Sequence, residues 1–325
     1  MTDTRDDATT ELATFGETML RLAPPAGIRL ETATDLSFRT AGAESNVAIA
    51  AARLGTDATW LSKLPDSPLG RRVLADTRRH GVENAVVMAD EGRVGTYYLD
   101  FGGEPRGTEV VYDRANAAVT TATPEELDLD PVREAEVFYT SGITPALSET
   151  LAATTERLLE TAVEAGTTTA FDLNYRAKLW DHETAKATCE GLFPHVDVLV
   201  VAERDARAVL EESGDAAAIG RSLADAHGFE TVVVTRGAEG ALAVHEGTVY
   251  DRPAFETETL DPVGTGDAFV GAFLASRIDG DDIERALAAG AAAAALKRTI
   301  QGDLAVITPA ELERVIAEEG GGIGR

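Results

Sequence analysis

Short runs of apolar and β-branched residues recur along this chain, and no other feature constrains its fold as strongly. Runs with the character of buried strands lie at 58–64, 85–88, 136–142, 168–173, 196–201 and 231–235. Segments with helical spacing, such as 69–80 and 148–164, separate them. Strands that alternate with helices form a parallel sheet with helices on its faces. The sequence therefore predicts an α/β fold with a mostly parallel central sheet flanked by helices.

Two β-rich parts of the chain break this alternation. The runs 94–101 and 108–114 flank Gly102-Gly103-Glu104-Pro105, which predicts a hairpin in place of a crossover helix. A first strand is expected at 12–22, through Gly16. We expect about 22–41 and 93–116 to form a small β-sheet lid. The whole chain, 1–325, is expected to be one domain, because α/β folds of this size often build a single core.

The C-terminal third carries a further set of expected elements. These are a hairpin at 241–245 and 248–251, helices at 268–278 and 283–298, and a last helix that starts at Thr308-Pro309. Threonine and proline are a favourable pair at a helix start.

The stretch Asp261-Pro262-Val263-Gly264-Thr265-Gly266-Asp267 places two glycines and a carboxylate directly before an apolar helical run. Such a helix start directs free backbone N–H groups and the positive end of the helix dipole at an anion. Two interpretations of Asp267 stay open. It caps its helix, for which Asp is favoured, or it takes a proton from an attacking hydroxyl group in phosphoryl transfer.

A second glycine turn, Gly42-Ala43-Glu44-Ser45-Asn46, precedes a helix of small residues that Gly55 ends. Polar side chains on a tight turn before such a helix suit the close approach of a ligand. A plain loop before a well-packed helix is the alternative.

Three further positions carry side chains suited to a sugar or an acid. Arg176 follows the strand 168–173, and strand ends of this type face the ligand crevice in open α/β sheets. Its guanidinium matches a carboxylate or a phosphate bidentately, and a solvated loop arginine is the alternative. On the hairpin, Tyr97, Tyr112 and Arg114 would cover a polyol or an acid, unless they only pack across the strands.

The net charge of −27, from 56 acidic and 29 basic residues, disfavours nucleic acid and anionic membranes as partners. The chain has four lysines: Lys63, Lys178, Lys186 and Lys297. In molar salt the screening length falls to about 3 Å, so that self-repulsion largely vanishes. We therefore expect a halophilic protein from a salt-rich cytoplasm, with an ordinary acidic protein as the alternative.

Cys189 is the only cysteine, which excludes an intrachain disulfide and a cysteine metal cluster and fits a reducing, cytoplasmic location. The start of the chain, 1–11, is polar and acidic and resembles no signal or transit peptide. It is expected to be a flexible tail.

Several familiar catalytic motifs are missing. No lysine follows a glycine, so there is no Walker-type phosphate loop, and Gly264-x-Gly266 lacks a third glycine at 269, so the dinucleotide fingerprint fails. A polar turn near 42–46 and an anion hole with a carboxylate at 264–267 remain. This pair suits a kinase of a small hydroxylated molecule, because phosphoryl transfer requires mainly alignment and charge stabilisation.

Two segments, Gly42–Ala48 with Ala52-Arg53-Leu54-Gly55, and Asp261–Phe269, together resemble the two signatures of the PfkB (ribokinase-like) carbohydrate kinases, in order and in separation. The resemblance covers nearly the whole chain, from Phe15-Gly16-Glu17 to Gly302-Asp303. It implies a ribokinase-like fold, in which a small β lid covers the sugar site beside a mostly parallel sheet.

Within that family the chain most resembles the 2-keto-3-deoxygluconate kinases, through Gly42-Ala43-Glu44, Tyr97, Tyr112-Asp113-Arg114, 141–147, and 171–176 with Leu179-Trp180. The resemblance implies Asp267 as the catalytic base and Gly264, Thr265 and Gly266 as the anion hole. The implied sugar-acid contacts are Gly42, Asn46, Tyr97, Tyr112, Arg114, Arg176, Asp267 and Asp303. The implied nucleotide contacts are Thr235, Arg236, Gly237, Gly240, Gly264 and Gly266.

The same resemblance implies ATP and Mg²⁺ as cofactors. The family often has Asn-x-x-Glu after the strand at 196–201, where this chain has Ala202-Glu203-Arg204-Asp205. Asp205 is therefore the residue expected to reach Mg²⁺, through water.

The sequence thus predicts a kinase that phosphorylates the terminal hydroxyl group of 2-keto-3-deoxygluconate, with the galactose-derived epimer as a further substrate, in a modified Entner–Doudoroff route. A fructokinase or ribokinase of the same family is the first alternative, although a neutral sugar has no need of Arg114 and Arg176. A non-catalytic sugar-binding regulator is the second, although it would not need Asp267. The expected partners are the sugar acid, ATP and further copies of the chain in a homo-oligomer.

Overall fold

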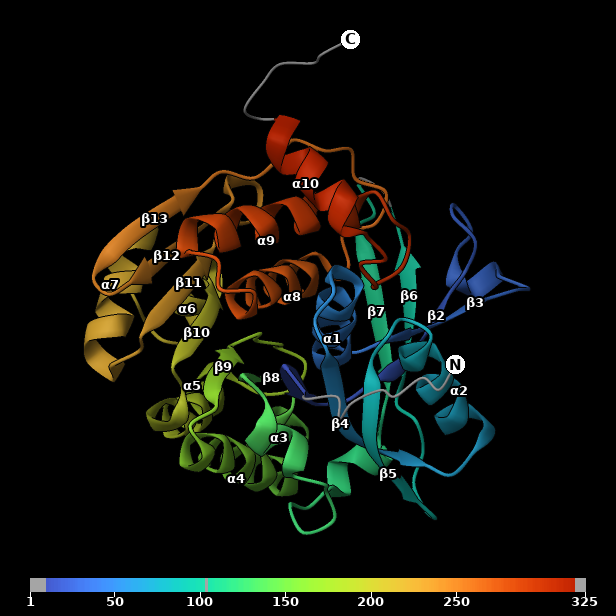
Figure 1. Cartoon of the computed structure of the whole chain (residues 1–325). Helices are drawn as coiled ribbons and strands as arrows, with labels where there is room; N and C mark the ends of the chain where they lie inside the picture. Colours follow the sequence, from blue (N-terminus) through green and yellow to red (C-terminus); the bar gives the residue numbers. More distant parts are fainter. Residues whose placement is uncertain (1–9, 103–104, 319–325) are drawn as a thin grey trace, which may run out of the picture.

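A computed structural model describes residues 10–102 and 105–318 of the chain (Figure 1). The strands are β1 (Leu12–Phe15), β2 (Met19–Ala23), β3 (Ser37–Ala41), β4 (Ala58–Pro65), β5 (Glu83–Ala89), β6 (Thr96–Phe101), β7 (Thr108–Asp113), β8 (Val137–Ser141), β9 (Thr168–Asp172), β10 (Val198–Ala202), β11 (Thr231–Thr235), β12 (Ala241–His245) and β13 (Thr248–Arg252). The α-helices are α1 (Ala43–Leu54), α2 (Pro68–Arg78), α3 (Asp130–Glu134), α4 (Glu149–Ala165), α5 (His182–Leu192), α6 (Glu203–Ala208), α7 (Ala216–His227), α8 (Thr265–Ile278), α9 (Ile283–Arg298) and α10 (Pro309–Glu318).

The larger sheet is mostly parallel. Among the described residues it has nine strands in the order β13-β12-β11-β10-β9-β8-β1-β4-β5. Neighbours from β11 to β5 run parallel, whereas β12 and β13 form an antiparallel extension at one edge. Helices α8 and α9 cover one face, and α3, α4 and α5 cover the other (Figure 1). The expected fold class is confirmed.

Strand β10 shows why the sheet has helices on both faces. Its side chains alternate in direction, so Leu199 and Val201 pack in one core with α4, α5 and α7, while Val198 and Val200 pack in the other with α1, α8 and α9. A strand that is apolar on both faces must be covered by helices on both faces of the sheet.

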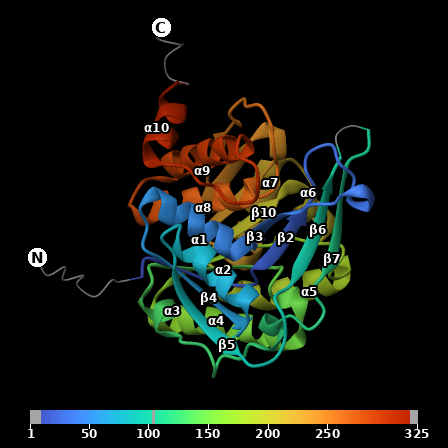
Figure 2. The same cartoon turned by 90° about the vertical axis from the view of Figure 1, so that its right-hand side faces the viewer.

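Four strands form a separate small sheet in the order β3-β2-β6-β7. Its hairpin β6–β7 was predicted, and the two strands extend together along one side of the molecule (Figure 2). Residues 103–104 of the expected turn lie outside the described residues. The sheet also includes Met19–Ala23, which begins before the expected lid segment 22–41.

The single strand expected at 12–22 was wrong. The chain forms β1 in the large sheet, leaves at Gly16 and continues as β2 in the small sheet. A Cβ atom at Gly16 would lie 2.2 Å from the carboxyl group of Glu44, so the turn passes directly against α1, and a larger residue at position 16 would have to displace that buried side chain. One short segment thus connects the two sheets.

Helix α5 was not predicted. Asp181 caps it by accepting a hydrogen bond from Thr184 N at 2.8 Å. Of the expected tail, 1–11, residues 1–9 lie outside the described residues. Glu11, directly before β1, already pairs with the residue before β4, since its N–H donates to Asp57 O at 2.8 Å.

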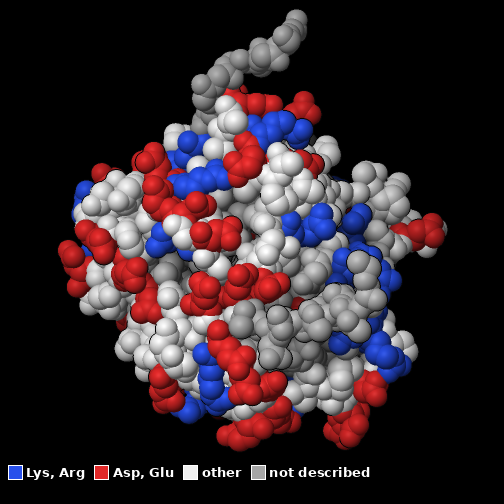
Figure 3. Space-filling model, in the orientation of Figure 1, with Lys and Arg blue, Asp and Glu red and all other residues white. Residues whose placement is uncertain are grey.

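No helix in the described parts of the chain is both long and apolar enough to cross a bilayer. Acidic side chains are spread over the face seen in Figure 3, and basic side chains lie among them, with groups at the top and toward the right-hand side.

Candidate active site

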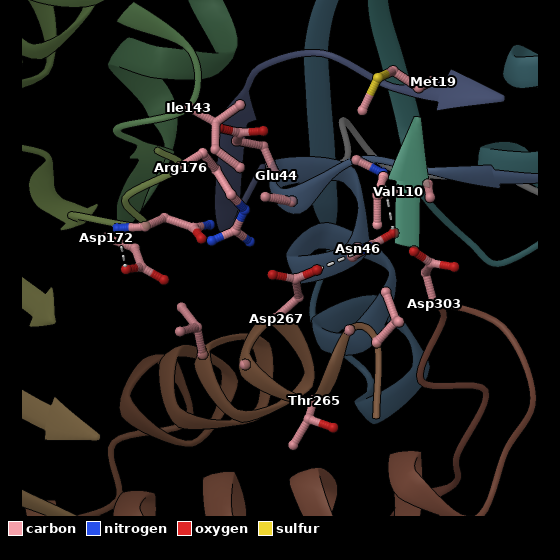
Figure 4. Close-up of a pocket in the computed structure, with 18 of the residues that line it drawn as sticks. Met19, Glu44, Asn46, Val110, Ile143, Asp172, Arg176, Thr265, Asp267 and Asp303 are labelled. Atoms are coloured by element: carbon pink, nitrogen blue, oxygen red, sulfur yellow. Dashed lines mark hydrogen bonds between the residues drawn. The ribbon is translucent and has the colours of Figure 1, made fainter. Parts of the chain in front are cut away.

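A cavity of about 470 Å³ lies between the carboxyl ends of the large sheet's strands, the small sheet and the start of α8. Asp172, Ala202 and Thr235 line it from the ends of β9, β10 and β11, and Tyr97 and Tyr112 line it from the small sheet. Ligands of open α/β sheets bind at this edge, because loops and helix starts converge there. Figure 4 shows polar side chains from distant parts of the chain directed into the cavity.

Residues 261–267 are here called the anion loop, and 262–267 form one wall of the cavity. Gly264 has a φ of +80°, and a Cβ atom there would lie 2.0 Å from the carbonyl oxygen of Asp303. Only glycine suits both conditions, and α8 begins directly after it at Thr265. The N–H of Thr265 donates to Pro262 O at 3.3 Å, and that of Ala268 donates to Gly264 O at 3.0 Å. The N–H groups of Gly266 and Asp267, also in the first turn of α8, have no acceptor within the helix and are available to an anion in the cavity.

Asp267 lies in the first turn of α8 and faces the cavity (Figure 4). Its Oδ2 accepts a hydrogen bond from Asn46 Nδ2 at 2.7 Å. This contact depends on close packing of α1 on α8, where a Cβ atom at Gly271 would lie 2.6 Å from that of Ala50. Burial raises the pKa of Asp267 to about 6, against the lowering effects of the Asn46 hydrogen bond and the Arg176 charge. A carboxyl group with such a pKa is suited to be a base near neutral pH.

Arg176 follows β9 and points between Asp172 and Asp267 (Figure 4). The turn before it is fixed by Asp172, which accepts a hydrogen bond from Asn174 N at 3.0 Å. Burial, together with the charge of Asp267, raises the pKa of Asp172 to about 7. Arg176 therefore supplies positive charge beside the expected base.

On the small-sheet side, Arg114 stacks over Tyr112, with its Cζ 4.7 Å from the ring centroid. One of its nitrogens lies 3.3 Å from Glu17 Oε2, and both side chains line the cavity. Burial raises the pKa of Glu17, and the charge of Arg114 opposes that rise. Glu17 was not predicted as a site residue, and only the fold places it beside Arg114.

Asp303 closes the cavity next to the anion loop. It accepts hydrogen bonds from Tyr97 OH at 2.7 Å and from Arg21, and Arg21 also binds Asp261 at 2.8 Å. Arg21 is buried and was not predicted as a site residue. Its signal in the sequence was a charged residue in the apolar run Met19-Leu20-Arg21-Leu22.

Glu44 is a further buried carboxyl group of the site, with 1% of its surface exposed. It accepts hydrogen bonds from Ser141 Oγ at 2.7 Å and Thr144 Oγ1 at 2.9 Å. Burial raises its pKa to about 7. Its place inside the Gly42–Asn46 turn could have identified Glu44 as a site residue. The prediction for that turn named only Gly42 and Asn46, which also line the cavity.

The expected nucleotide residues divide into two groups. Gly264 lines the main cavity alone, and Gly237 and Gly240 line only an adjoining cavity of about 180 Å³, whereas Thr235 and Gly266 line both. The side chain of Arg236 lies elsewhere, because both of its terminal nitrogens bind the Asp251 carboxylate, at 2.8 and 2.9 Å. Its guanidinium is thus occupied in an ion pair, and only its backbone belongs to the turn.

Asp205, the expected metal residue, lines the cavity from α6 and is 7% exposed. Its Oδ1 accepts a hydrogen bond from Arg204 Nε at 3.1 Å. Together with Asp172 it offers carboxylate oxygens, the ligands that Mg²⁺ prefers. The donor set therefore fits a magnesium ion held by one or two carboxylates and by the phosphates of a ligand.

Comparison with known proteins agrees with this geometry. The family model described as "pfkB family carbohydrate kinase" matches residues 9–309. A 2-dehydro-3-deoxygalactonokinase from Haloferax volcanii is 65% identical over 317 residues, which cover 98% of this chain and 100% of the relative. A 2-dehydro-3-deoxygluconokinase from Thermoproteus tenax is 30% identical over 95% of each chain. The crystal structure of a 2-dehydro-3-deoxygluconokinase from Thermotoga maritima superposes with a TM-score of 0.88 at 34% identity, covering 95% of this chain and 99% of that one.

Proposed function

The chain belongs to the PfkB family of carbohydrate kinases, and on that premise we propose that it transfers the terminal phosphoryl group of ATP to the terminal hydroxyl group of a 2-keto-3-deoxy sugar acid. The chain is thus a carbohydrate kinase. The acid substrate, the catalytic base and the anion hole are our proposal. We place the reaction in the modified Entner–Doudoroff route that the resemblance implies.

The proposal depends most on one arrangement. Asp267 and the anion loop share a cavity with Arg114 and Arg176. A base beside an anion hole suits phosphoryl transfer, and the arginines suit an acceptor that carries its own negative charge.

In the proposed reaction the carboxylate of Asp267 accepts the proton of the terminal hydroxyl group. The oxygen then bonds to the γ-phosphorus of ATP, the bond from that phosphorus to the bridging oxygen breaks, and ADP leaves with the bonding electrons. We assign the stabilisation of charge on the transferred group to the N–H groups of Gly264, Thr265 and Gly266, of which that of Thr265 would first have to leave Pro262 O. Arg176 points toward Asp267, so we assign it to this reacting end of the cavity.

We assign the substrate carboxylate to Arg114, on the small-sheet wall. The small sheet would then act as the lid over the sugar acid, with Tyr97 and Tyr112 against its carbon chain. The nucleotide base would occupy the adjoining cavity, whose lining is mainly apolar and includes Phe255 and Phe269. Mg²⁺, bound through Asp205 or Asp172, would neutralise phosphate charge.

The 65% identity to a kinase named for 2-dehydro-3-deoxygalactonate favours that epimer, also called 2-keto-3-deoxygalactonate, as the better substrate. This ranks the epimers in the opposite order from the sequence-based expectation. 2-Keto-3-deoxygluconate stays in the proposal as the second substrate.

A phosphotransfer assay in molar KCl with ATP and Mg²⁺ tests the proposal. We expect the highest kcat/KM with 2-keto-3-deoxygalactonate, then with 2-keto-3-deoxygluconate, and much lower values with fructose and ribose. Faster turnover of either neutral sugar would overturn the acid assignment. Asp267→Asn should lose kcat by about 100-fold or more, because a general base contributes that much. An Asp267→Asn enzyme that keeps most of its kcat would refute the base assignment.

A further inference from the structure

Lys297, near the end of α9, is a buried cation that the proposed reaction leaves without a role. It is one of four lysines in the chain, and its side chain is 0% exposed. Its ammonium group donates hydrogen bonds to the carbonyl oxygens of Asp261 and Ile300, both at 3.1 Å. Burying a charge is costly, so a lysine here must interact with specific partners.

The two carbonyl groups belong to two loops that meet at the active site. Asp261 is the first residue of the anion loop, and Ile300 begins the turn that leads to Asp303. The next residues of that turn bind the anion loop directly, because Gly302 N donates to Asp261 Oδ2 at 2.9 Å. Lys297 therefore connects these two loops by a hydrogen bond to a backbone carbonyl group of each.

The surrounding charges show that this position needs a cation. Asp261 and Asp303 both lie near Lys297, and they oppose the lowering of its pKa by burial. Arg21 binds both carboxylates but supplies only one positive charge against two negative ones. Without the ammonium group, the pocket would contain two carbonyl oxygens and one excess negative charge.

From this arrangement we propose that Lys297 is a built-in cation that positions the anion loop, so that the enzyme does not need a monovalent metal ion at this place. Lys297 is a positioning residue, since it acts through Asp261 on Gly264 to Gly266. The inference rests on the proposed function, in which those N–H groups stabilise the transferred phosphoryl group. A displacement of about 1 Å in such a group can cost about 100-fold in rate.

The test compares three variants in chloride salts of matched concentration. Lys297→Ala removes the ammonium group and leaves space for a small cation. Lys297→Met removes the charge and fills the space. Lys63→Ala is the matched control: Lys63 is 8% exposed and also binds a backbone carbonyl, that of Thr121, but it does not line the cavity. The salts are tetramethylammonium, which is too large to enter, and sodium, potassium, ammonium and methylammonium.

We expect the wild-type kcat to be the same in all these salts. Lys297→Ala should lose kcat by about 100-fold in tetramethylammonium chloride and recover most of it in one of the small cations, with the KM of the sugar acid changing less. Lys297→Met should lose kcat in every salt. Lys63→Ala should keep the wild-type kcat in every salt.

Three results would each overturn the proposal. They are a wild-type enzyme that requires potassium, a Lys297→Ala variant that keeps its kcat, and a loss of kcat in Lys297→Ala that no small cation restores. If the wild-type protein phosphorylates no acceptor, the proposed function fails instead. The Lys297 inference is then decided by thermal unfolding: small cations should raise the unfolding temperature of Lys297→Ala but not of Lys297→Met, and equal shifts would overturn it.

Discussion

At the scale of single residues, the pH dependence of kcat should report the environment of Asp267. Burial raises its pKa to about 6, and the base must be ionised to accept a proton, so kcat should fall as the pH drops through that value. Asp172 and Glu44 have pKa values of about 7 nearby, and coupling among the three groups should broaden the transition. Measurement of kcat from about pH 5 to about pH 8 checks this.

Arg176→Met provides the matched test of that profile. The positive charge of Arg176 lowers the pKa of Asp267, so its removal should move the acid limb to higher pH. The same change should reduce kcat at the plateau by about 100-fold, because charge on the transferred group loses a partner. An acid limb that stays in place would show that another group controls it.

Arg114→Met should reduce the preference for acids. A hydrogen bond to a charged group contributes about 1.5–3 kcal/mol, so kcat/KM for the sugar acid should fall by about 10- to 100-fold, with little change for a neutral sugar. Arg106→Met is the control: Arg106 lies beside the same hairpin but binds Asp100 and does not line the cavity. Equal losses for acid and neutral substrates would contradict the assignment of Arg114 to the carboxylate.

The residues predicted from the sequence share a property: each lies in a local pattern that implies its chemistry. Asp267 and Gly264 lie in a glycine-rich helix start, and Arg176 follows a strand end. Glu17 and Lys297 lie in no such pattern, and the apolar run around Arg21 marked that residue as unusual without implying its chemistry. Arg21 binds Asp261 and Asp303, which are 240 and 282 positions away, and contacts over such separations exist only in the folded chain.

At the scale of elements, the contact between α1 and α8 places Asn46 on Asp267. Gly271 has no space for a side chain, since a Cβ atom would lie 2.7 Å from Val47 O as well as close to Ala50. Gly271→Ala should therefore destabilise the protein by about 1–3 kcal/mol, as overpacked cores do, and should lower kcat through Asn46. Denaturant unfolding and the kinetic assay measure the two effects.

Gly191→Ala, in α5, is the control for that substitution. It also lies in a helix, but a Cβ atom there meets no atom within 4 Å. The change should stabilise the protein by up to about 1 kcal/mol, because alanine is the better helix former. A Gly271→Ala variant as stable as Gly191→Ala would show that the two helices have room to separate.

The elements that the sequence predicted are those with long apolar runs, as in α8 and α9, or with a clear apolar stripe, as in α4. The parallel strands and α4, α8 and α9 were found near their observed bounds. The break between β1 and β2 was missed because Gly16 is a single glycine within an apolar run, and its reason, the Glu44 side chain, is distant in sequence. Helix α5 was missed because, apart from its Asp181 cap, it has few apolar residues to mark a buried stripe.

At the scale of the whole molecule, the charge of −27 sets a condition on stability. At 0.1 M salt the screening length is about 10 Å, so that acidic side chains on neighbouring elements repel one another, whereas at 1 M it is about 3 Å. Ion pairs offset part of this repulsion, but only 29 basic residues are available for 56 acidic ones. The folded chain should therefore depend on salt more than most proteins do.

We expect the thermal unfolding temperature to rise by about 10 °C or more between about 0.1 M and about 2 M KCl, since several kcal/mol of repulsion correspond to such a shift at this chain length. A triple variant removes three exposed carboxylates that have no ion pair among the described residues; its changes are Glu91→Gln, Glu125→Gln and Asp225→Asn. If repulsion is the cause, this variant should be more stable than the wild type in dilute buffer and equal to it in concentrated KCl. A rise of the same size in both proteins would instead assign the effect of salt to surface hydration, because hydration does not depend on the removed charges in this way.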